Sequence, residues 1–281
     1  MKSGMKIPPP MITIIDPLER NRWFNFQEIW AFRDLFYLLV WRDIKTRYAQ
    51  SVLGIGWAII QPLFSMVVFT VVFGNMAKIS SDGVPYAIFS FAALVPWTYF
   101  SGALTAAGGS LLTARGIITK VYFPRIIVPL VAVVAKLWDF VIALLILFGV
   151  MAYFGFAPTA QTLYLPVIVL LMILTAAGAG MWLTALSLQY RDIQYSLGFV
   201  VQLLMYASPV VYPVSMVPER FRLLYYLNPM ASVIEAFRSV LLGTNPIPWQ
   251  ALSIGAGMTF LLALSGSMYF MSMERRFADV V

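Results

Sequence analysis

Residues Trp30–Pro62 read WAFRDLFYLLVWRDIKTRYAQSVLGIGWAIIQP. The first half mixes charged and aromatic residues and the second half begins an apolar run, and this change indicates how the chain is organised. If its first half is a helix, successive side chains lie about 100° apart. One face then carries Trp30, Tyr37, Trp41, Ile44 and Tyr48, and the other carries Arg42, Asp43, Thr46 and Arg47. The apolar run Leu35–Trp41 has seven residues, whereas a membrane crossing needs roughly 20. We therefore predict an N-terminal amphipathic interface helix over 29–50 that lies in the membrane surface.

The second half of the stretch begins a membrane-spanning helix. Ser51, Gly54 and Gly56 permit a turn, and an unbroken apolar run follows them. A surface helix that is joined by a hinge to the first spanning helix indicates an element that is moved by a force applied from outside the membrane.

Composition identifies the chain as a membrane protein. Of its 281 residues 61% are hydrophobic and 11% are charged, whereas a soluble domain carries about 25% charged residues. Cysteine and histidine are both absent, which excludes disulfides, thiolate metal ligands and the usual proton shuttle. Residues 1–28 are rich in proline and charge and have no apolar centre typical of a signal peptide. We predict that they form a cytoplasmic N-terminal arm.

Six long apolar runs predict an all-α polytopic membrane protein with six transmembrane helices. The runs cover about 54–77, 86–112, 126–154, 163–189, 195–212 and 249–273, within one transmembrane domain over 29–281. The second run is rich in small residues, which let helices approach closely, so we expect it to be central. For the same reason we expect the cluster Ala176–Gly180 in the fourth run to be a close-packing face.

Two short amphipathic pieces lie between the fifth and sixth runs. Glu219–Leu227 and Met230–Leu242 are each too short to cross a membrane. Asn228-Pro229 between them is an N-cap and first-turn signature. We predict a re-entrant extracellular helical hairpin over 219–242.

The distribution of Lys and Arg predicts the orientation, because cytoplasmic loops of membrane proteins carry more cations. Fourteen lie on one side of the predicted topology, namely eight in 1–53, three in 113–125, Arg191 and two at the C-terminus. The other side carries Lys78, Arg220, Arg222 and Arg238. Both termini are therefore predicted to be cytoplasmic. The net charge of +7 reflects this topology and not a nucleic-acid-binding surface.

Sequence motifs of enzymes are absent. The chain contains no G-x-x-x-x-G-K-[ST] phosphate-binding loop, no H-E-x-x-H and no G-x-S-x-G. An enzyme within the membrane needs a positioned acid, base or metal. We therefore expect no catalytic residue, no metal site and no nucleotide site in this chain.

Two pairs of charged residues are spaced to share a helical face. Lys136 and Asp139 lie within the third run, where they form either a gating or ion-coupling pair or a structural pair that neutralises itself. Glu235 and Arg238 lie on the second piece of the hairpin, where they either line an outer vestibule or form a solvated surface pair.

Aromatic residues within the runs are candidates for a substrate path. Trp97, Tyr99 and Phe100 in the second run and Tyr206 in the fifth could offer flat faces on which sugar rings stack. The alternative is that these rings only pack or anchor their helices, as in the aromatic belts of membrane proteins.

Three stretches in one order resemble a known family: WRDIKTRYAQSVLGIGWAIIQPL, KVYFPR and LNPMASVIEAFRSVLLG. They resemble the permease subunits of type-2 ABC exporters, most of all the branch that moves O-antigen, capsular or teichoic-acid polysaccharides. The resemblance covers nearly the whole chain, from about Asp34 to Arg276. It implies a homodimer in the bacterial inner membrane that pairs with two copies of a separate ABC ATPase subunit and exports a lipid-linked glycan. ATP and Mg would then bind to that partner and not to this chain.

The resemblance also implies roles for parts of the chain. Asp34–Tyr48 and Thr113–Arg125 would contact the ATPase, and Glu219–Leu242 would form the outer gate. The charged residues of the implied ATPase contact are Arg42, Asp43, Lys45, Arg47, Arg115, Lys120 and Arg125. A drug or another lipid as cargo is the alternative within the superfamily, and an ion-coupled transporter or channel is the alternative outside it. An ATPase encoded by the adjacent gene would favour an ABC exporter over an ion-coupled transporter or channel.

Overall fold

The structure is a computed structural model that describes residues 26–49, 54–190 and 192–274. Most of the predicted arm over 1–28, together with Arg191 and the C-terminal residues 275–281, lies outside the described residues. The described ranges contain helices and no strand, which agrees with the predicted all-α fold.

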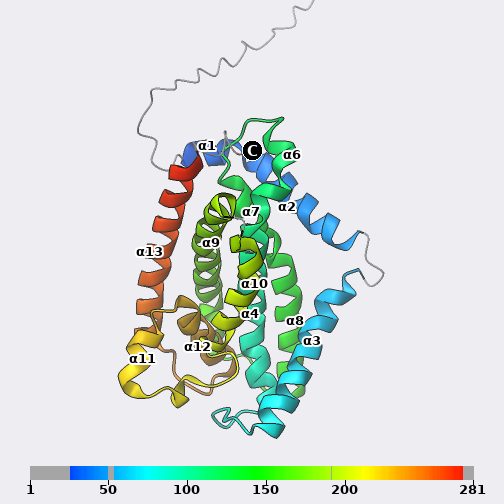
Figure 1. Cartoon of the computed structure of the whole chain (residues 1–281). Helices are drawn as coiled ribbons and strands as arrows, with labels where there is room; N and C mark the ends of the chain where they lie inside the picture. Colours follow the sequence, from blue (N-terminus) through cyan, green and yellow to red (C-terminus); the bar gives the residue numbers. More distant parts are fainter. Residues whose placement is uncertain (1–25, 50–53, 191, 275–281) are drawn as a thin grey trace, which may run out of the picture.

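Five helical segments are long and apolar enough to cross a membrane (Figure 1). They are α3 (Gly56–Phe69) with the π-helix η1 (Thr70–Met76), α4 (Tyr86–Gly108), α7 (Ile127–Ala135) with α8 (Leu137–Tyr153), the 3-10 helix η2 (Ala160–Tyr164) with α9 (Leu165–Gln189), and α13 (Trp249–Glu274). Each lies within a few residues of a predicted run, because the length of an apolar run limits the helix that can be buried in a bilayer.

The fifth predicted run forms a shorter helix than expected. Helix α10 extends over Asp192–Tyr206, and its 15 residues rise roughly 22 Å at 1.5 Å per residue. This is less than the ~30 Å of a bilayer's hydrocarbon core. The predicted end at residue 212 is therefore wrong. Pro209 lies three residues beyond the helix and disfavours helical geometry in the residue before it.

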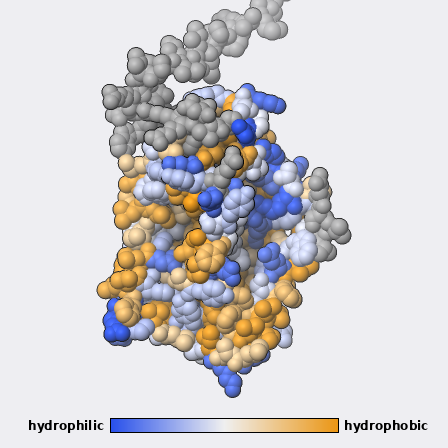
Figure 2. Space-filling view, in the orientation of Figure 1, coloured by the Kyte–Doolittle hydropathy of each residue, from blue (hydrophilic) through white to orange (hydrophobic). Residues whose placement is uncertain are grey.

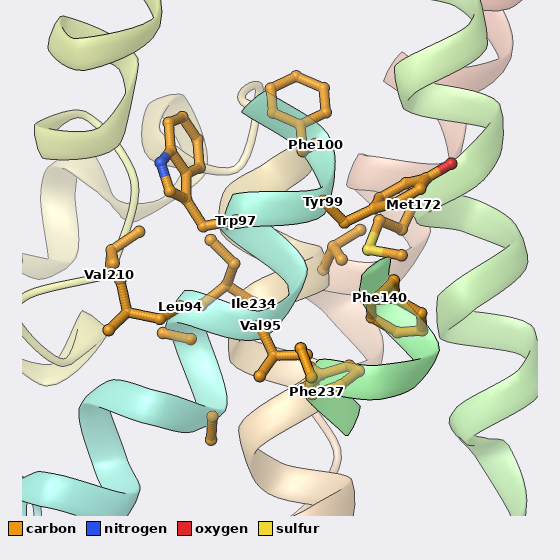
Figure 3. Close-up of a cluster of buried hydrophobic side chains, with 14 of the residues drawn as sticks. Leu94, Val95, Trp97, Tyr99, Phe100, Phe140, Met172, Val210, Ile234 and Phe237 are labelled. Carbon is orange, nitrogen blue, oxygen red and sulfur yellow. The ribbon is translucent and has the colours of Figure 1, made fainter. Parts of the chain in front are cut away.

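Helix α4 is the centre of the bundle, as its small residues predicted. In the most apolar 18-residue stretch of α4, 78% of the residues are buried. In the corresponding stretch of Gly56–Met76 none are buried. Helix α4 contacts α3, α7, α8, α9 and α12. Figure 3 shows the buried cluster in which side chains of α4 meet Phe140 of α8 and Phe237 of α12.

Close approach of α9 and α13 depends on two glycines. A Cβ atom at Gly178 would lie 2.7 Å from the backbone nitrogen of Ala263. A Cβ atom at Gly266 would lie 2.3 Å from the carbonyl oxygen of Gly178. These distances leave no room for a side chain, so the predicted close-packing face around Ala176–Gly180 is confirmed.

Two helices, α1 (Phe26–Ala31) and α2 (Arg33–Tyr48), lie across one end of the bundle (Figure 1). Helix α2 packs against α7 and buries Leu39, whereas its Tyr37 and Trp41 rings and the Trp30 ring of α1 are exposed. The apolar residues of α2 are therefore divided between a face toward the bundle and a face away from it. The polar residues do not all share the outward face, since Asp43 and Arg47 are half-buried.

The predicted hairpin consists of α11 (Glu219–Tyr225) and α12 (Pro229–Leu242). The Asn228 side chain accepts a hydrogen bond of 3.1 Å from the backbone nitrogen of Met230, so the predicted N-cap is confirmed. Helix α12 ends at Gly243, which has the left-handed conformation that favours glycine. Because most of α12 is buried against α4, α9 and α13, it belongs to the core of the fold.

Candidate functional site

Exposed cations gather at the end of the bundle that α2 crosses. Arg42 and Lys45 come from α2, and Arg115 and Lys120 come from α6 (Arg115–Ile118) and the turn after it. A cavity of about 220 Å³ separates α2 from α5 (Ser110–Thr113) and α6. Figure 2 shows hydrophilic side chains at this end and apolar side chains along the sides of the bundle. We call Arg42, Lys45, Arg115 and Lys120 the basic surface.

Several residues of the implied ATPase contact, among them Arg42, Asp43, Arg47 and Arg125, are bonded within the chain. Asp43 accepts a bond of 2.8 Å from its neighbour Arg42. The backbone nitrogen of Arg125 donates to Oε1 of Glu274 at 3.1 Å, and its guanidinium donates to the Glu274 carbonyl at 3.2 Å. Arg47 points into the bundle and pairs with Asp139. An outward-facing Arg47 on the interface helix was predicted, and this placement is wrong.

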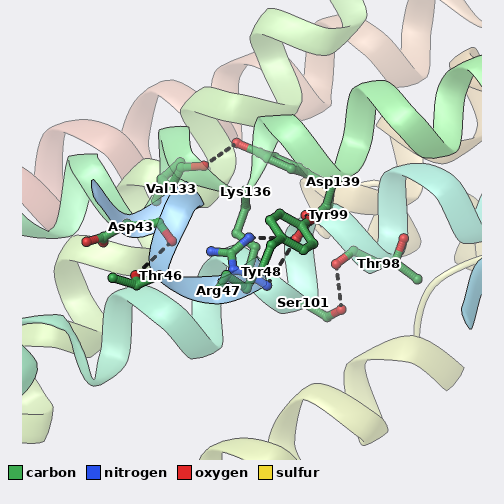
Figure 4. Close-up of polar contacts among 10 residues, drawn as sticks. All are labelled: Asp43, Thr46, Arg47, Tyr48, Thr98, Tyr99, Ser101, Val133, Lys136 and Asp139. Atoms are coloured by element: carbon green, nitrogen blue, oxygen red, sulfur yellow. Dashed lines mark hydrogen bonds and ion pairs between the residues drawn. The ribbon is translucent and has the colours of Figure 1, made fainter. Parts of the chain in front are cut away.

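Arg47, Tyr48, Lys136 and Asp139 form a polar cluster that joins α2 to the bundle (Figure 4). Oδ2 of Asp139 accepts bonds from Arg47 at 2.7 Å and from Lys136 at 3.3 Å, while Oδ1 accepts one from the Tyr48 hydroxyl. The predicted pair of Lys136 and Asp139 is therefore present, with two further partners. Sequence separations of 91 and 92 residues hid those partners. The sequence signal that could have indicated these partners is the position of Arg47 and Tyr48, just before the turn into the first spanning helix.

The aromatic side chains of α4 are packed into the core. Trp97, Tyr99 and Phe100 are 2–6% exposed, and the Tyr99 ring meets the Phe140 ring edge to face at 5.6 Å. The burial of the Trp97 and Phe100 rings fits the packing alternative, whereas Tyr99 also lines a cavity between α2, α3, α4 and α8. Tyr206 at the end of α10 is 48% exposed, and its stacking role stays a prediction.

At the end of the bundle opposite α2, Arg238 connects the hairpin to neighbouring segments by hydrogen bonds. Its Nε donates to the Phe89 carbonyl at 3.1 Å, and its Nη2 donates to the Val210 carbonyl at 2.8 Å. The guanidinium lies 3.6 Å from the centroid of the Phe89 ring, and the residue is 7% exposed. The alternative of a solvated surface pair is therefore wrong for Arg238, which links α12 to α4 and to the segment after α10.

Glu235 lies beside Arg238 on the wall of a cavity of about 560 Å³, so the vestibule alternative fits the geometry. Asp82, Arg222 and Tyr226 also line this cavity. Oε2 of Glu235 is buried and has no hydrogen-bond partner within the described part of the chain. Burial raises the pKa of the Glu235 carboxyl, while a hydrogen bond with Tyr226 and the charges of Arg238 and Arg222 act in the opposite direction.

The raised pKa predicts a gain of stability on replacing Glu235 by glutamine. A carboxyl whose pKa is higher in the folded state destabilises the fold above that pKa, and the penalty is relieved as the pH falls through it. We expect Glu235→Gln to unfold at a higher temperature than the parent at pH 8, and the difference to shrink toward pH 5. Thermal unfolding of both proteins in detergent at several pH values measures this. A difference that does not change with pH would contradict the explanation.

Comparisons with known proteins place these features in a family. The profile of the ABC-2 type transporter family matches residues 34–242. The O-antigen export system permease protein RfbA of Myxococcus xanthus is 28% identical over 91% of this chain and 98% of its own length. A protein of the same name from Klebsiella pneumoniae is 26% identical over 88% of this chain and 95% of its own length. The polysialic acid transport protein KpsM of Escherichia coli is 23% identical over 72% of this chain and 78% of its own length.

The matched range extends from the start of α2 to the end of α12. It includes the basic surface, the polar cluster and the hairpin of α11 and α12. With three-quarters of the chain matched by one family profile, the chain belongs to the ABC-2 type transporter family.

Proposed function

We propose that this chain is the transmembrane subunit of an ATP-driven exporter that moves a lipid-linked polysaccharide of the O-antigen kind across the bacterial inner membrane. The observation that carries the proposal is the likeness to O-antigen export permeases over about nine-tenths of this chain and of theirs. The polysialic acid transport protein is a further relative whose name indicates a polysaccharide.

Six crossings with both termini in the cytoplasm are the proposed topology. Leu39 of α2 and Met273 of α13 belong to one apolar cluster, so both described ends of the chain lie at the same end of the bundle. An even number of crossings is needed for this. Helix α10 is too short to cross by itself, so we propose that it makes the sixth crossing together with the residues that follow it. The hairpin of α11 and α12 then forms a re-entrant gate on the outer side. The positive-inside rule places the basic surface in the cytoplasm.

The proposed assembly is a homodimer with two ATPase subunits, embedded in membrane lipid. Large apolar side chains remain exposed along α10, including Phe199 and Leu203, and along α3, including Phe64. Lipid and a second copy of the chain are the partners that such faces accept. Helices α1 and α2 would lie at the level of the lipid headgroups, because Trp30 of α1 and Tyr37 and Trp41 of α2 are exposed.

The basic surface is the proposed docking site of the ATPase, which would bring ATP and Mg to the complex. Exposed ion pairs contribute only ~0–1 kcal/mol each, so single changes should have small effects. We expect the double change Arg42→Glu and Lys45→Glu to reduce co-purification of the ATPase and to uncouple hydrolysis from export. Affinity purification of the complex followed by an assay of ATP turnover measures both effects.

The matched control reverses two exposed cations at the opposite end of the molecule, Lys78→Glu and Arg220→Glu. This variant has the same change of net charge and should assemble with the ATPase normally. Normal assembly and normal export by the Arg42 and Lys45 variant would rule out docking at this surface.

A further inference from the structure

A cavity of about 420 Å³ adjoins the polar cluster between α2, α3, α4 and α8. Arg47, Lys136 and Asp139 lie on its wall, and their side chains are 28%, 24% and 29% exposed. The three charged side chains are therefore partly accessible in the described structure. Gln61 and Trp57 of α3 line the opposite wall.

The charged side chains on this wall have a net positive charge, which favours binding of an anion. Asp139 is the only acidic residue among the described residues that line the cavity, and it faces two cations. Its carboxylate takes one bond from each of them, whereas a guanidinium has five N–H groups and an ammonium has three. Several charged donors therefore remain for an oxyanion, and arginine is the residue best suited to bind a phosphate.

The surroundings of the cavity favour a ligand with an apolar tail. Trp57 on its wall is 52% exposed, and Ile60 and Phe64, one and two turns farther along α3, are exposed as well. An anion bound to Arg47 and Lys136 could thus extend a hydrocarbon chain along the outer face of α3. A soluble anion would gain nothing from this apolar face.

We propose that this cavity binds the phosphate group of a membrane amphiphile through Arg47 and Lys136, in competition with Asp139. Two sources share this chemistry, an anionic phospholipid and an isoprenoid phosphate or diphosphate that carries a glycan. Assignment to the glycan carrier rests on the proposed function, whereas the phosphate site itself does not.

The test uses the purified full-length chain in micelles of an uncharged detergent. Dihexanoyl phosphatidic acid and farnesyl diphosphate are the anionic probes, with a terminal phosphate or diphosphate. The matched probes without net charge are farnesol and dihexanoyl phosphatidylcholine, whose choline neutralises its phosphodiester. Tryptophan fluorescence reports binding, because Trp57 lines the cavity. The variant Trp57→Phe shows which part of the signal comes from this site.

We expect both phosphate probes to bind and the two control probes to bind at least tenfold more weakly. Loss of one charge-assisted hydrogen bond in Lys136→Gln should weaken binding roughly tenfold, while Lys136→Arg should retain it. Removal of the competing carboxylate in Asp139→Asn should strengthen binding. A purely structural cluster would instead lower the stability of both variants without opposite changes in affinity. Lys78→Gln, which removes an exposed lysine at the other end, should have no effect.

Equal binding of the anionic probes and of the probes without net charge, or unchanged affinity in Lys136→Gln, would overturn the phosphate site. Tighter binding of farnesyl diphosphate than of phosphatidic acid would assign the site to the glycan carrier, and equal binding would overturn that assignment in favour of phospholipid. The proposed function is tested separately by export in cells. Export without probe binding would refute this site alone, whereas probe binding without any role in export would refute the proposed function alone.

Discussion

Replacing Trp97 by alanine is expected to lower the free energy of unfolding by about 3–5 kcal/mol, the usual cost of removing a large aromatic side chain from a core. The Trp97 side chain is 4% exposed and its ring lies 5.7 Å from the ring of Phe100. Because α4 is the centre of the bundle, the resulting cavity should loosen its contacts with several helices. Protein yield, ATP turnover of the complex and export should therefore fall together. Thermal unfolding and activity assays on the same preparations measure this.

Two variants serve as controls for this prediction. Trp97→Phe keeps most of the apolar volume and should cost much less stability. Tyr206→Ala removes an exposed ring and should change the free energy of unfolding by no more than about 0.5 kcal/mol. If Trp97→Ala had normal stability and ATP turnover but lost export, its ring would belong to the substrate path after all.

Replacing Arg47 by glutamate is expected to have the second large effect, because it would set two carboxylates against each other at the junction of α2 and α8. Arg47 and Asp139 are now 2.7 Å apart. Loss of one partner of a buried ion pair costs about 3–5 kcal/mol, and we expect about 1–3 kcal/mol here because both groups keep partial contact with solvent. With α2 released, ATP hydrolysis should continue while export stops.

The charge-swapped double variant Arg47→Glu with Asp139→Arg tests the cause. It restores a pair of opposite charges at the same positions, so stability and export should recover in part. A double-mutant cycle on thermal unfolding gives the interaction energy. No recovery, together with an interaction energy near zero, would show that the pair does not hold α2 to the bundle.

The parts of the fold that depend on local sequence were predictable. Apolar length located the five long crossing segments, and Asn228-Pro229 located the start of α12. The central position of α4 followed from its small residues, since close helix packing excludes larger ones. Each of these features depends on neighbouring residues and one physical constraint.

The errors arose where distant residues decide the outcome. The orientation of Arg47 depends on Asp139, which is 92 residues away in the sequence. Helical periodicity alone predicts an outward orientation. Burial of Arg238 depends on carbonyl groups of Phe89 and Val210, which no pattern in α12 reveals. For the rings of α4 the sequence leaves both alternatives open, because it does not distinguish a ring that faces a channel from one that faces another helix.

The central claim is that this chain carries a lipid-linked polysaccharide across the inner membrane, and its most direct test is the location of that polysaccharide in cells that lack the chain. Lipid-linked and surface polysaccharides are separated by cell fractionation and quantified in the deletion strain, with and without a plasmid copy of the gene. We predict that the polysaccharide accumulates on its lipid carrier inside the deletion strain, disappears from the surface, and returns there with the plasmid copy. Unchanged surface polysaccharide in the deletion strain would contradict the account.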